Sequence, residues 1–268
     1  MSFWDRLLRR PPRLHVAHDS GTGDGDERPV VVLVHGIASS SVTFTNLVPL
    51  LEKDYRCIAI DLLGFGESPV DKESTYTLGR HADALRRTLG SLHPRTPFTI
   101  VGHSLGSLIA ARFAAHHPDD VNHLVMVSPP IYLPPSVMGD PADRANMGLY
   151  FAAYEYLRGN QEFTTWAAGA LAAIAPIKNV LEVTERNWVP FVRSLKNAVE
   201  SQTTLADLSA VDAPVDVIYG TLDPFLAPGG LKIVGQLRKV TVTRVSGVDH
   251  VIRPKLAQEI EKRIREHG

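Results

Sequence analysis

The sequence contains little that would cross-link the chain or carry it through a membrane. Only one of its 268 residues, Cys57, is a cysteine, which excludes an internal disulfide framework and any zinc site built from several cysteines. The longest apolar stretch, residues 167–177, includes Gly169 and Pro176 and has about half the length that spans a bilayer. We therefore expect neither a disulfide scaffold nor a transmembrane helix.

An excess of one charge is also absent. The chain carries 28 Lys and Arg against 29 Asp and Glu, for a net charge of −1. Without a broad positive field to attract phosphate groups, nucleic acid is not an expected partner. The composition, 44% hydrophobic and 21% charged, is that of an ordinary globular protein. The length suits one large domain, or one domain with an insertion, whose core needs no disulfide or metal.

The first twelve residues lack the apolar core of a secretory signal. They place Trp4 and other apolar side chains among three arginines before the Pro11-Pro12 pair. One interpretation is a short interfacial membrane anchor. The other is a terminal helix that ends at the prolines and buries little surface. We favour the second, and so expect no membrane contact of the N-terminus and a cytoplasmic protein.

Strand and helix patterns alternate along much of the chain. Val30–Val34 is an unbroken apolar run, typical of a strand covered on both faces of a parallel sheet. The other expected strands are residues 55–60, 98–101, 123–128, 215–219 and 240–245, and the expected helices are residues 77–92, 104–117 and 254–267. This alternation predicts βαβ units, and hence an α/β protein with helices on both sheet faces.

The alternation stops between two proline pairs and resumes near residue 206. Residues 133–205 have a helical pattern, no convincing strand and many aromatic residues. We expect some aromatics to form a small core and others to face the main domain. The prediction is one α/β core made of residues 1–132 and 206–268, with residues 133–205 inserted as a helical cap.

The strongest chemical signal is the pentapeptide Gly102-His103-Ser104-Leu105-Gly106, which fits the pattern G-x-S-x-G. It lies between an expected strand and an expected helix, where a serine is held in a strained turn at the carboxyl edge of the sheet. The two glycines remove Cβ clashes in that turn, and the helix N-terminus favours a negative charge. The context predicts Ser104 as a nucleophile.

A serine hydroxyl needs a base, and the base needs an orienting carboxylate. His250 and Asp223 each follow an expected strand and therefore reach the same carboxyl edge. Asp61 is the chief competitor, interpreted as a loop-structuring residue, and Asp249 is expected to point away from His250. The other histidines are assigned elsewhere: a loop-supporting role for His35, a solvated position for His81, and the surface at the opposite edge for His116, His117 and His123.

The negative oxygen that forms during attack on a carbonyl needs two hydrogen-bond donors. We assign these to the backbone N–H groups of Leu105 and Ile37, each worth roughly 3 kcal/mol of transition-state stabilisation. Gly36 lets the backbone of the second donor approach closely. The expected substrate pocket is lined by Gly36, His103, Ile131, Phe225 and Val251.

Five segments together resemble the α/β-hydrolase superfamily: HGIASSS, DLLGFGESP, VGHSLGS, GTLDPF and GVDHVIRP. The resemblance implies a mostly parallel, eight-stranded sheet with a lid after the sixth strand, and a serine hydrolase with the triad Ser104, Asp223 and His250. Its antiparallel first strands are marked only at residues 13–18. Haloalkane dehalogenases and epoxide hydrolases of this superfamily have aspartate where this chain has Ser104, which speaks against those two reactions.

The leading functional hypothesis is a carboxylesterase-like enzyme that cleaves a small or medium apolar ester through an acyl-enzyme. It requires no metal and no organic cofactor, and acts as a monomer or homodimer. The same triad also serves C–C bond, lactone or thioester hydrolysis and cofactor-free perhydrolysis. An acidic C–C substrate would need cap arginines, for which the candidates are Arg144, Arg158 and Arg193. A third possibility is a receptor-like binding protein on a hydrolase scaffold.

Overall fold

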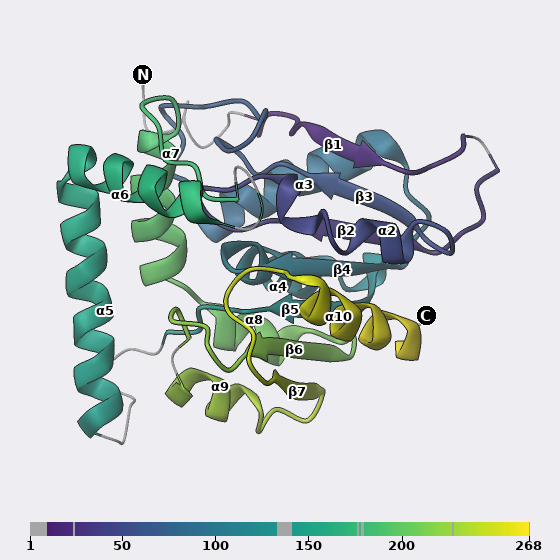
Figure 1. The fold of residues 1–268 in the computed structure, drawn as a ribbon. Coiled ribbons are helices and arrows are strands. Elements are labelled where there is room, and N and C mark those ends of the chain that lie inside the picture. The colour runs from purple at the N-terminus through teal and green to yellow at the C-terminus, as the bar shows by residue number, and fades with distance from the viewer. Residues whose placement is uncertain are drawn as a thin grey trace.

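The computed structural model of the protein describes residues 10–23, 25–132, 141–175, 177, 180–226 and 228–267. Its strands form one sheet in the order β1-β3-β2-β4-β5-β6-β7. They are β1 (Val16–Asp19), β2 (Val30–Val34), β3 (Arg56–Ile60), β4 (Phe98–His103), β5 (Val121–Val127), β6 (Val215–Gly220) and β7 (Val240–Val245) (Figure 1). β1 runs antiparallel to β3, and the remaining neighbours are parallel. The α/β class predicted from the sequence is confirmed.

The described sheet has seven strands rather than the eight implied by the resemblance. Among the described residues, one strand, β1, precedes β2, and the ten residues between them are a polar segment rich in glycine, SGTGDGDERP, whose composition disfavours a strand. Counted over the described strands, the helical insertion consequently follows the fifth instead of a sixth. The predictions for the N-terminus fall mostly on residues 1–9, which lie outside the described residues.

Helices cover both faces of the sheet. α3 (Leu78–Leu92), α4 (Leu105–His116), α8 (Thr204–Ala210) and α9 (Pro228–Val234) contribute to one apolar layer, and α2 (Val48–Leu51) and α10 (Pro254–His267) to the other. Short 3₁₀ turns are η1 (Ser41–Phe44) and η2 (Pro118–Asp120). Within β2, Val32 packs in the first layer and Leu33 in the second. Because side chains alternate along a strand, two covered faces explain why β2 is apolar throughout.

Between β5 and β6 the described chain is helical. Its elements before α8 are α5 (Pro141–Gly159), α6 (Gln161–Ile174), α7 (Trp188–Ser194) and a wider π-helical segment, η4 (Leu195–Glu200). The Glu182 N–H donates to the Ala38 carbonyl over 2.7 Å, and Arg186 Nη2 donates to the Ser68 carbonyl over 2.9 Å. Since Ala38 and Ser68 lie in loops that follow β2 and β3, the insertion stands over the carboxyl edge of the sheet (Figure 1). The boundaries of a cap at residues 133–205 stay a prediction.

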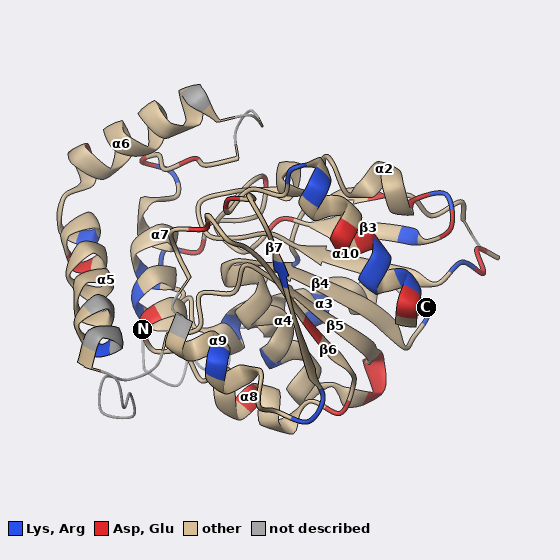
Figure 2. Ribbon diagram, turned by 60° about the horizontal axis from the view of Figure 1, so that its bottom comes forward, with Lys and Arg blue, Asp and Glu red and all other residues tan. Residues whose placement is uncertain are grey.

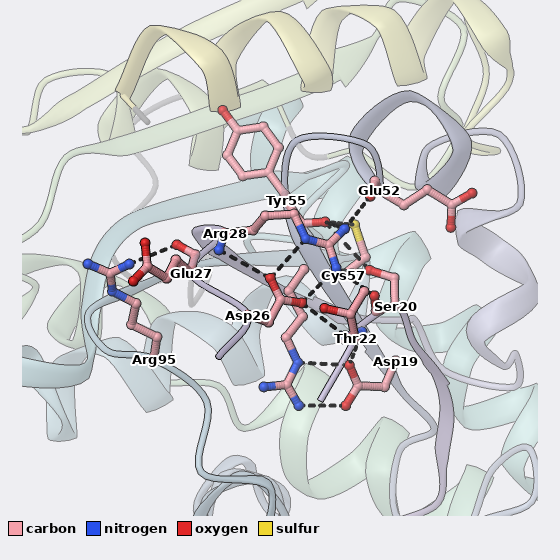
Figure 3. A network of polar contacts seen from close by, with 12 residues as sticks. Asp19, Ser20, Thr22, Asp26, Glu27, Arg28, Glu52, Tyr55, Cys57 and Arg95 are labelled. Carbon is pink, nitrogen blue, oxygen red and sulfur yellow. Dashed lines mark hydrogen bonds and ion pairs between the residues drawn. The ribbon is translucent and has the colours of Figure 1, made fainter. Parts of the chain in front are cut away.

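The side chain of Arg28 helps to hold the polar segment between β1 and β2. The Arg28 guanidinium pairs with the Asp26 carboxylate and donates to the carbonyl oxygens of Ser20, over 2.7 Å, and Glu52, over 2.6 Å (Figure 3). These bonds fasten the segment to the end of α2. Cys57 lies buried beside this network, and burial raises the pKa of its thiol to about 12. A thiol with such a pKa is not a nucleophile at neutral pH.

The distribution of charge and the length of the helices concern the expectations about nucleic acid and about a transmembrane helix. Figure 2 shows Lys, Arg, Asp and Glu interspersed over the α/β part of the chain, in keeping with the net charge of −1. Within the described ranges, no helix is both long and apolar enough to cross a membrane. The expectation that nucleic acid is not a partner stays a prediction.

Two histidine predictions are wrong, because His81 and His123 are fully buried. His81 lies three residues after Leu78 on the inward face of α3, and its Nε2 is 3.1 Å from Ser194 Oγ. His123 was expected to begin a strand, but β5 starts two residues earlier, at Val121, which places His123 inside the sheet. Its Nε2 is 2.9 Å from Asp216 Oδ2.

The buried histidines predict a loss of stability in acid. Burial lowers the pKa of His35 to about 4 and those of His81 and His103 to about 3, whereas an unfolded histidine has a pKa of about 6.5. Below pH 6.5 the unfolded chain therefore binds protons that the folded chain does not, so the free energy of unfolding falls as pH falls. In His81→Gln, we expect this dependence, measured by urea unfolding between pH 6 and 5, to weaken by about 1 kcal/mol per pH unit.

His93→Gln is the matched control, because the His93 side chain is exposed and folding does not desolvate it. This variant should keep the wild-type dependence on pH. Equal dependence in wild type and His81→Gln would contradict the assignment of His81 as a neutral, buried group.

Candidate active site

Ser104 lies in the sharp turn between β4 and α4. Its backbone has φ 52° and ψ −124°, a conformation that is strained for a residue with a Cβ. Its N–H donates to the Val127 carbonyl over 2.9 Å, which fixes the turn to the end of β5. The side chain is at the carboxyl edge of the sheet, as the sequence predicts, and the residue keeps 9% of its surface exposed.

Three glycines permit close backbone approaches around this turn. A Cβ at Gly102 would lie 2.3 Å from the Gly106 carbonyl oxygen, and one at Gly106 would lie 2.1 Å from the Val34 carbonyl oxygen. A Cβ at Gly36 would lie 2.9 Å from the Ser104 Cβ. The glycines thus bring the loop after β2 against the nucleophile turn, since any side chain there would separate them.

Gly106→Ala is expected to lower the free energy of unfolding by about 3 kcal/mol, because the new methyl group meets backbone atoms that cannot rotate away. Gly90→Ala is the matched control. It lies in α3 with no atom within 4 Å of an added Cβ, and should gain up to about 1 kcal/mol. Urea unfolding of both variants measures the difference, and equal stabilities would show that the close approach at Gly106 is absent.

The loop after β2 is fixed by His35. Its Nε2 accepts a hydrogen bond from the Leu62 N–H over 2.8 Å, so its proton resides on Nδ1, which donates to the Gly36 carbonyl over 2.7 Å. The supporting role predicted for His35 is confirmed. This bond orients the peptide that precedes Ile37. Leu105 is the first residue of α4, where an N–H has no acceptor within the helix. Both proposed oxyanion donors therefore belong to segments that border Ser104.

His250 and Asp223 form the expected pair. His250 Nδ1 is 2.8 Å from Asp223 Oδ2, and Asp223 Oδ1 accepts from the Phe225 N–H over 2.9 Å. Burial raises the pKa of the Asp223 carboxyl, but the hydrogen bonds from His250 and Phe225 lower it more, and the net pKa lies below its ordinary value. An ionised Asp223 holds the proton of His250 on Nδ1 and leaves Nε2 free to accept another.

The rings of His103 and Phe225 also contact the ring of His250. His103 Nε2 donates to the His250 carbonyl over 2.8 Å, and the two ring centroids are 4.8 Å apart. Since His103 immediately precedes Ser104, this bond ties the loop of the base to the turn of the nucleophile. Phe225 meets the His250 ring edge-on, also at 4.8 Å. Among the other expected pocket residues, Val251 is half-buried beside His250, whereas Ile131 is fully buried in the apolar core.

The two competing carboxylates are engaged elsewhere, as expected. Asp61 Oδ1 accepts from the N–H and the hydroxyl of Ser41, each over 2.8 Å, and so holds the loop after β2. Asp249 pairs with Arg253 over 2.6 Å. Asp223 is therefore the carboxylate that orients His250.

Residues 29–252 match the model of the α/β hydrolase fold family. The chain belongs to the α/β hydrolase family. The resemblance inferred from the sequence is thus confirmed, and it covers both parts of the sheet and the helical insertion between them. The match includes Ser104, Asp223 and His250.

This α/β hydrolase is similar to several relatives and solved structures. A probable lysophospholipase, BODYGUARD 4 of Arabidopsis thaliana, is 42% identical over 116 residues, which are 42% of this chain and 28% of that protein. A cis-3-alkyl-4-alkyloxetan-2-one decarboxylase of Shewanella oneidensis is 34% identical over 46% of this chain and 37% of its own length. The matched segments thus span about a third of these relatives. A thermophilic esterase from Thermogutta terrifontis shares the fold, with a TM-score of 0.69, 20% identity, and coverage of 93% of this chain and 90% of its own.

The sequence did not predict how the insertion of this α/β hydrolase meets the acid loop, residues 224–226. The Tyr150 hydroxyl of α5 donates to the Pro224 carbonyl over 2.5 Å, and the Tyr132 hydroxyl donates to the Phe225 carbonyl over 3.0 Å. These tyrosines hold the loop that follows Asp223. The aromatic content of the insertion was the available signal, but it did not show which rings face the main domain.

Proposed function

We propose that this α/β hydrolase cleaves carboxylic esters through an acyl-enzyme, with Ser104 as nucleophile, His250 as base and Asp223 as the carboxylate that orients His250. The observation that carries the proposal is the 2.8 Å bond between His250 Nδ1 and Asp223 Oδ2, in a loop that His103 ties to the Ser104 turn. A protein that only binds a ligand has no need of a base oriented in this way.

In the proposed reaction, Ser104 Oγ attacks the ester carbonyl while its proton moves to His250 Nε2. Asp223 stabilises the imidazolium through Nδ1–H, and the N–H groups of Ile37 and Leu105 bind the oxyanion. His250 then returns the proton to the departing alcohol oxygen, which leaves an ester of Ser104. Water, deprotonated by His250, attacks that ester and releases the acid and the free serine hydroxyl.

The ester class is supported by the relative named a probable lysophospholipase, since the bond that such a name denotes is a carboxylic ester. Large apolar side chains stand exposed on the insertion, among them Trp166 and Leu171 of α6. The proposal includes a small or medium apolar substrate, admitted beneath a helical cap. A cytoplasmic location and a monomeric or homodimeric state accompany the proposal as predictions.

Lactone cleavage is the second candidate, favoured by the relative named as an oxetan-2-one decarboxylase, because an oxetan-2-one is a cyclic ester. Cleavage of an acidic C–C substrate has less support. Arg158 pairs with Glu200, and Arg193 Nη1 donates to the Ser74 carbonyl over 2.7 Å, so these two cap arginines are engaged by the protein itself.

The test is hydrolysis of p-nitrophenyl esters from acetate to decanoate, followed by stopped-flow absorbance and intact-protein mass spectrometry after rapid acid quench. We expect a burst of nitrophenolate and a mass increase of one acyl group, which peptic digestion should assign to the peptide that contains Ser104. Turnover of a dialkyl oxetan-2-one with inertness toward the esters would replace the proposal by lactone cleavage. Ligand-induced shifts in Tm without any turnover would replace it by a binding function.

A further inference from the structure

A second cluster of metal-ligating side chains lies away from the candidate active site. It comprises His123 near the start of β5, Asp216 near the start of β6, and His267 in the last turn of α10. Asp216 Oδ2 is 2.9 Å from His123 Nε2 and 3.5 Å from His267 Nε2. The three ligand atoms all lie within 4.8 Å of one another. Ser104, in contrast, follows the carboxyl end of β4, so the cluster occupies the opposite edge of the sheet.

The fold buries two of the three side chains of this cluster. β5 and β6 are parallel neighbours in which Val125 pairs with Asp216, and the α10 layer covers that face of both strands. The side chains of His123 and Asp216 are 0% and 2% exposed, whereas His267 keeps 37% of its side-chain surface. Two ligands are therefore fixed by the sheet, and the third closes over them from the solvent side.

The protein itself does not satisfy the cluster. In the described part of the chain, the buried atoms His123 Nδ1 and Asp216 Oδ1 have no hydrogen-bond partner. Leaving a carboxylate oxygen and an imidazole nitrogen unpartnered in a buried site costs free energy. A cation bound between the three side chains would compensate the buried carboxylate charge through the atoms that face one another, which are His123 Nε2, Asp216 Oδ2 and His267 Nε2.

We propose that His123, Asp216 and His267 form a zinc site. Two imidazole nitrogens and one carboxylate oxygen are a donor set that suits Zn²⁺, which is bound by three protein ligands and a water in open sites. Mg²⁺ and Ca²⁺ prefer sets made of oxygen atoms alone. The exposed side of His267 provides the direction from which an ion and its water enter. Modest movement of that terminal side chain brings its nitrogen to coordination distance.

The site would join the last turn of α10 to the two strands beneath it. α10 begins four residues after His250, at Pro254. An ion at its far end would hold the helix on the sheet without touching the reacting atoms. Zinc is thus assigned a stabilising role, and ester hydrolysis is expected to stay within about twofold with or without it, since no step of acyl transfer involves the ion.

The test uses the full chain without a histidine tag, dialysed against a chelator and then titrated with ZnCl₂ in a calorimeter. We expect one saturable site, a rise in Tm with Zn²⁺, and no comparable rise with MgCl₂. His267→Ala should weaken Zn²⁺ binding by at least about tenfold, because loss of a ligand costs no less than loss of a residue that supports one. His116→Ala, which removes an exposed histidine of α4, is the matched control and should bind as the wild type does.

Co²⁺ provides a second measurement that depends on geometry. Visible absorption bands typical of four-coordinate Co²⁺ should develop with one equivalent in the wild type and be lost in His267→Ala. His267 is exposed, so the variant should fold, and circular dichroism verifies this. Zn²⁺ binding of equal strength in wild type and His267→Ala, or equal Tm shifts with Zn²⁺ and Mg²⁺, would overturn the proposal.

Discussion

Ser104→Ala is expected to lower kcat/KM for p-nitrophenyl esters by about 10⁴-fold or more, because the oxyanion donors and substrate pocket remain while the nucleophile is lost. Alanine keeps the Cβ of serine, so the strained backbone at φ 52° is unchanged and the variant should fold. The loss should fall on kcat rather than KM, since the removed hydroxyl acts after the substrate is bound. Steady-state kinetics together with the burst amplitude measure both quantities.

Ser91→Ala is the control for this variant. Ser91 lies in α3 and its hydroxyl donates to the Thr88 carbonyl within the same helix, so its removal leaves the candidate site untouched. It should retain wild-type kinetics. A Ser104→Ala protein that is folded and hydrolyses the esters within about tenfold of the wild type would rule out Ser104 as the nucleophile of a cooperating triad.

Asp223→Asn is expected to lower kcat by about 10⁴-fold, because it would change which ring nitrogen of His250 carries the proton. Asp223 Oδ1 is held by the Phe225 N–H, so an asparagine there would keep its carbonyl oxygen on Phe225 and turn its NH₂ group toward His250 Nδ1. Nδ1 would then have to accept, and the ring proton would move to Nε2. An Nε2 that carries a proton cannot take one from Ser104.

Asp249→Asn is the matched control, since Asp249 adjoins His250 in sequence but pairs with Arg253 on the surface. Exposed ion pairs contribute little, so this variant should stay within about twofold of the wild-type kcat. Equal losses in both variants would indicate a general electrostatic effect on His250. The NMR signals of the His250 ring protons report the tautomer directly in each case.

Local patterns in the sequence predicted the framework of the sheet. The strands Val30–Val34 and Val240–Val245 and the helix Pro254–His267 have the bounds expected from hydrophobic periodicity. The turn at Ser104 was predictable because its glycines and its place between a strand and a helix are local features. The pairing of Asp223 with His250 followed from topology, since both residues come after parallel strands that end at one edge.

Contacts between distant segments could not be predicted in this way. The burial of His81 depends on Ser194, 113 residues away, and that of His123 depends on Asp216. The count of eight strands came from the resemblance rather than from the periodicity of this chain, and the described residues form a seven-stranded sheet. Periodicity shows that a helix has an apolar face, but the partner of that face is set by the tertiary fold.

The tyrosine contacts to the loop after Asp223 have a consequence for protein engineering. Tyr150 and Tyr132 donate to carbonyl groups of Pro224 and Phe225, in the loop that immediately follows Asp223. The insertion is therefore no independent module that can be exchanged between enzymes to alter selectivity. Tyr132 belongs to the α/β core and would remain, but a foreign insertion would have to supply a hydroxyl group at the Pro224 carbonyl. Without it, the loop that follows Asp223 would be held less firmly and proton transfer through His250 would slow.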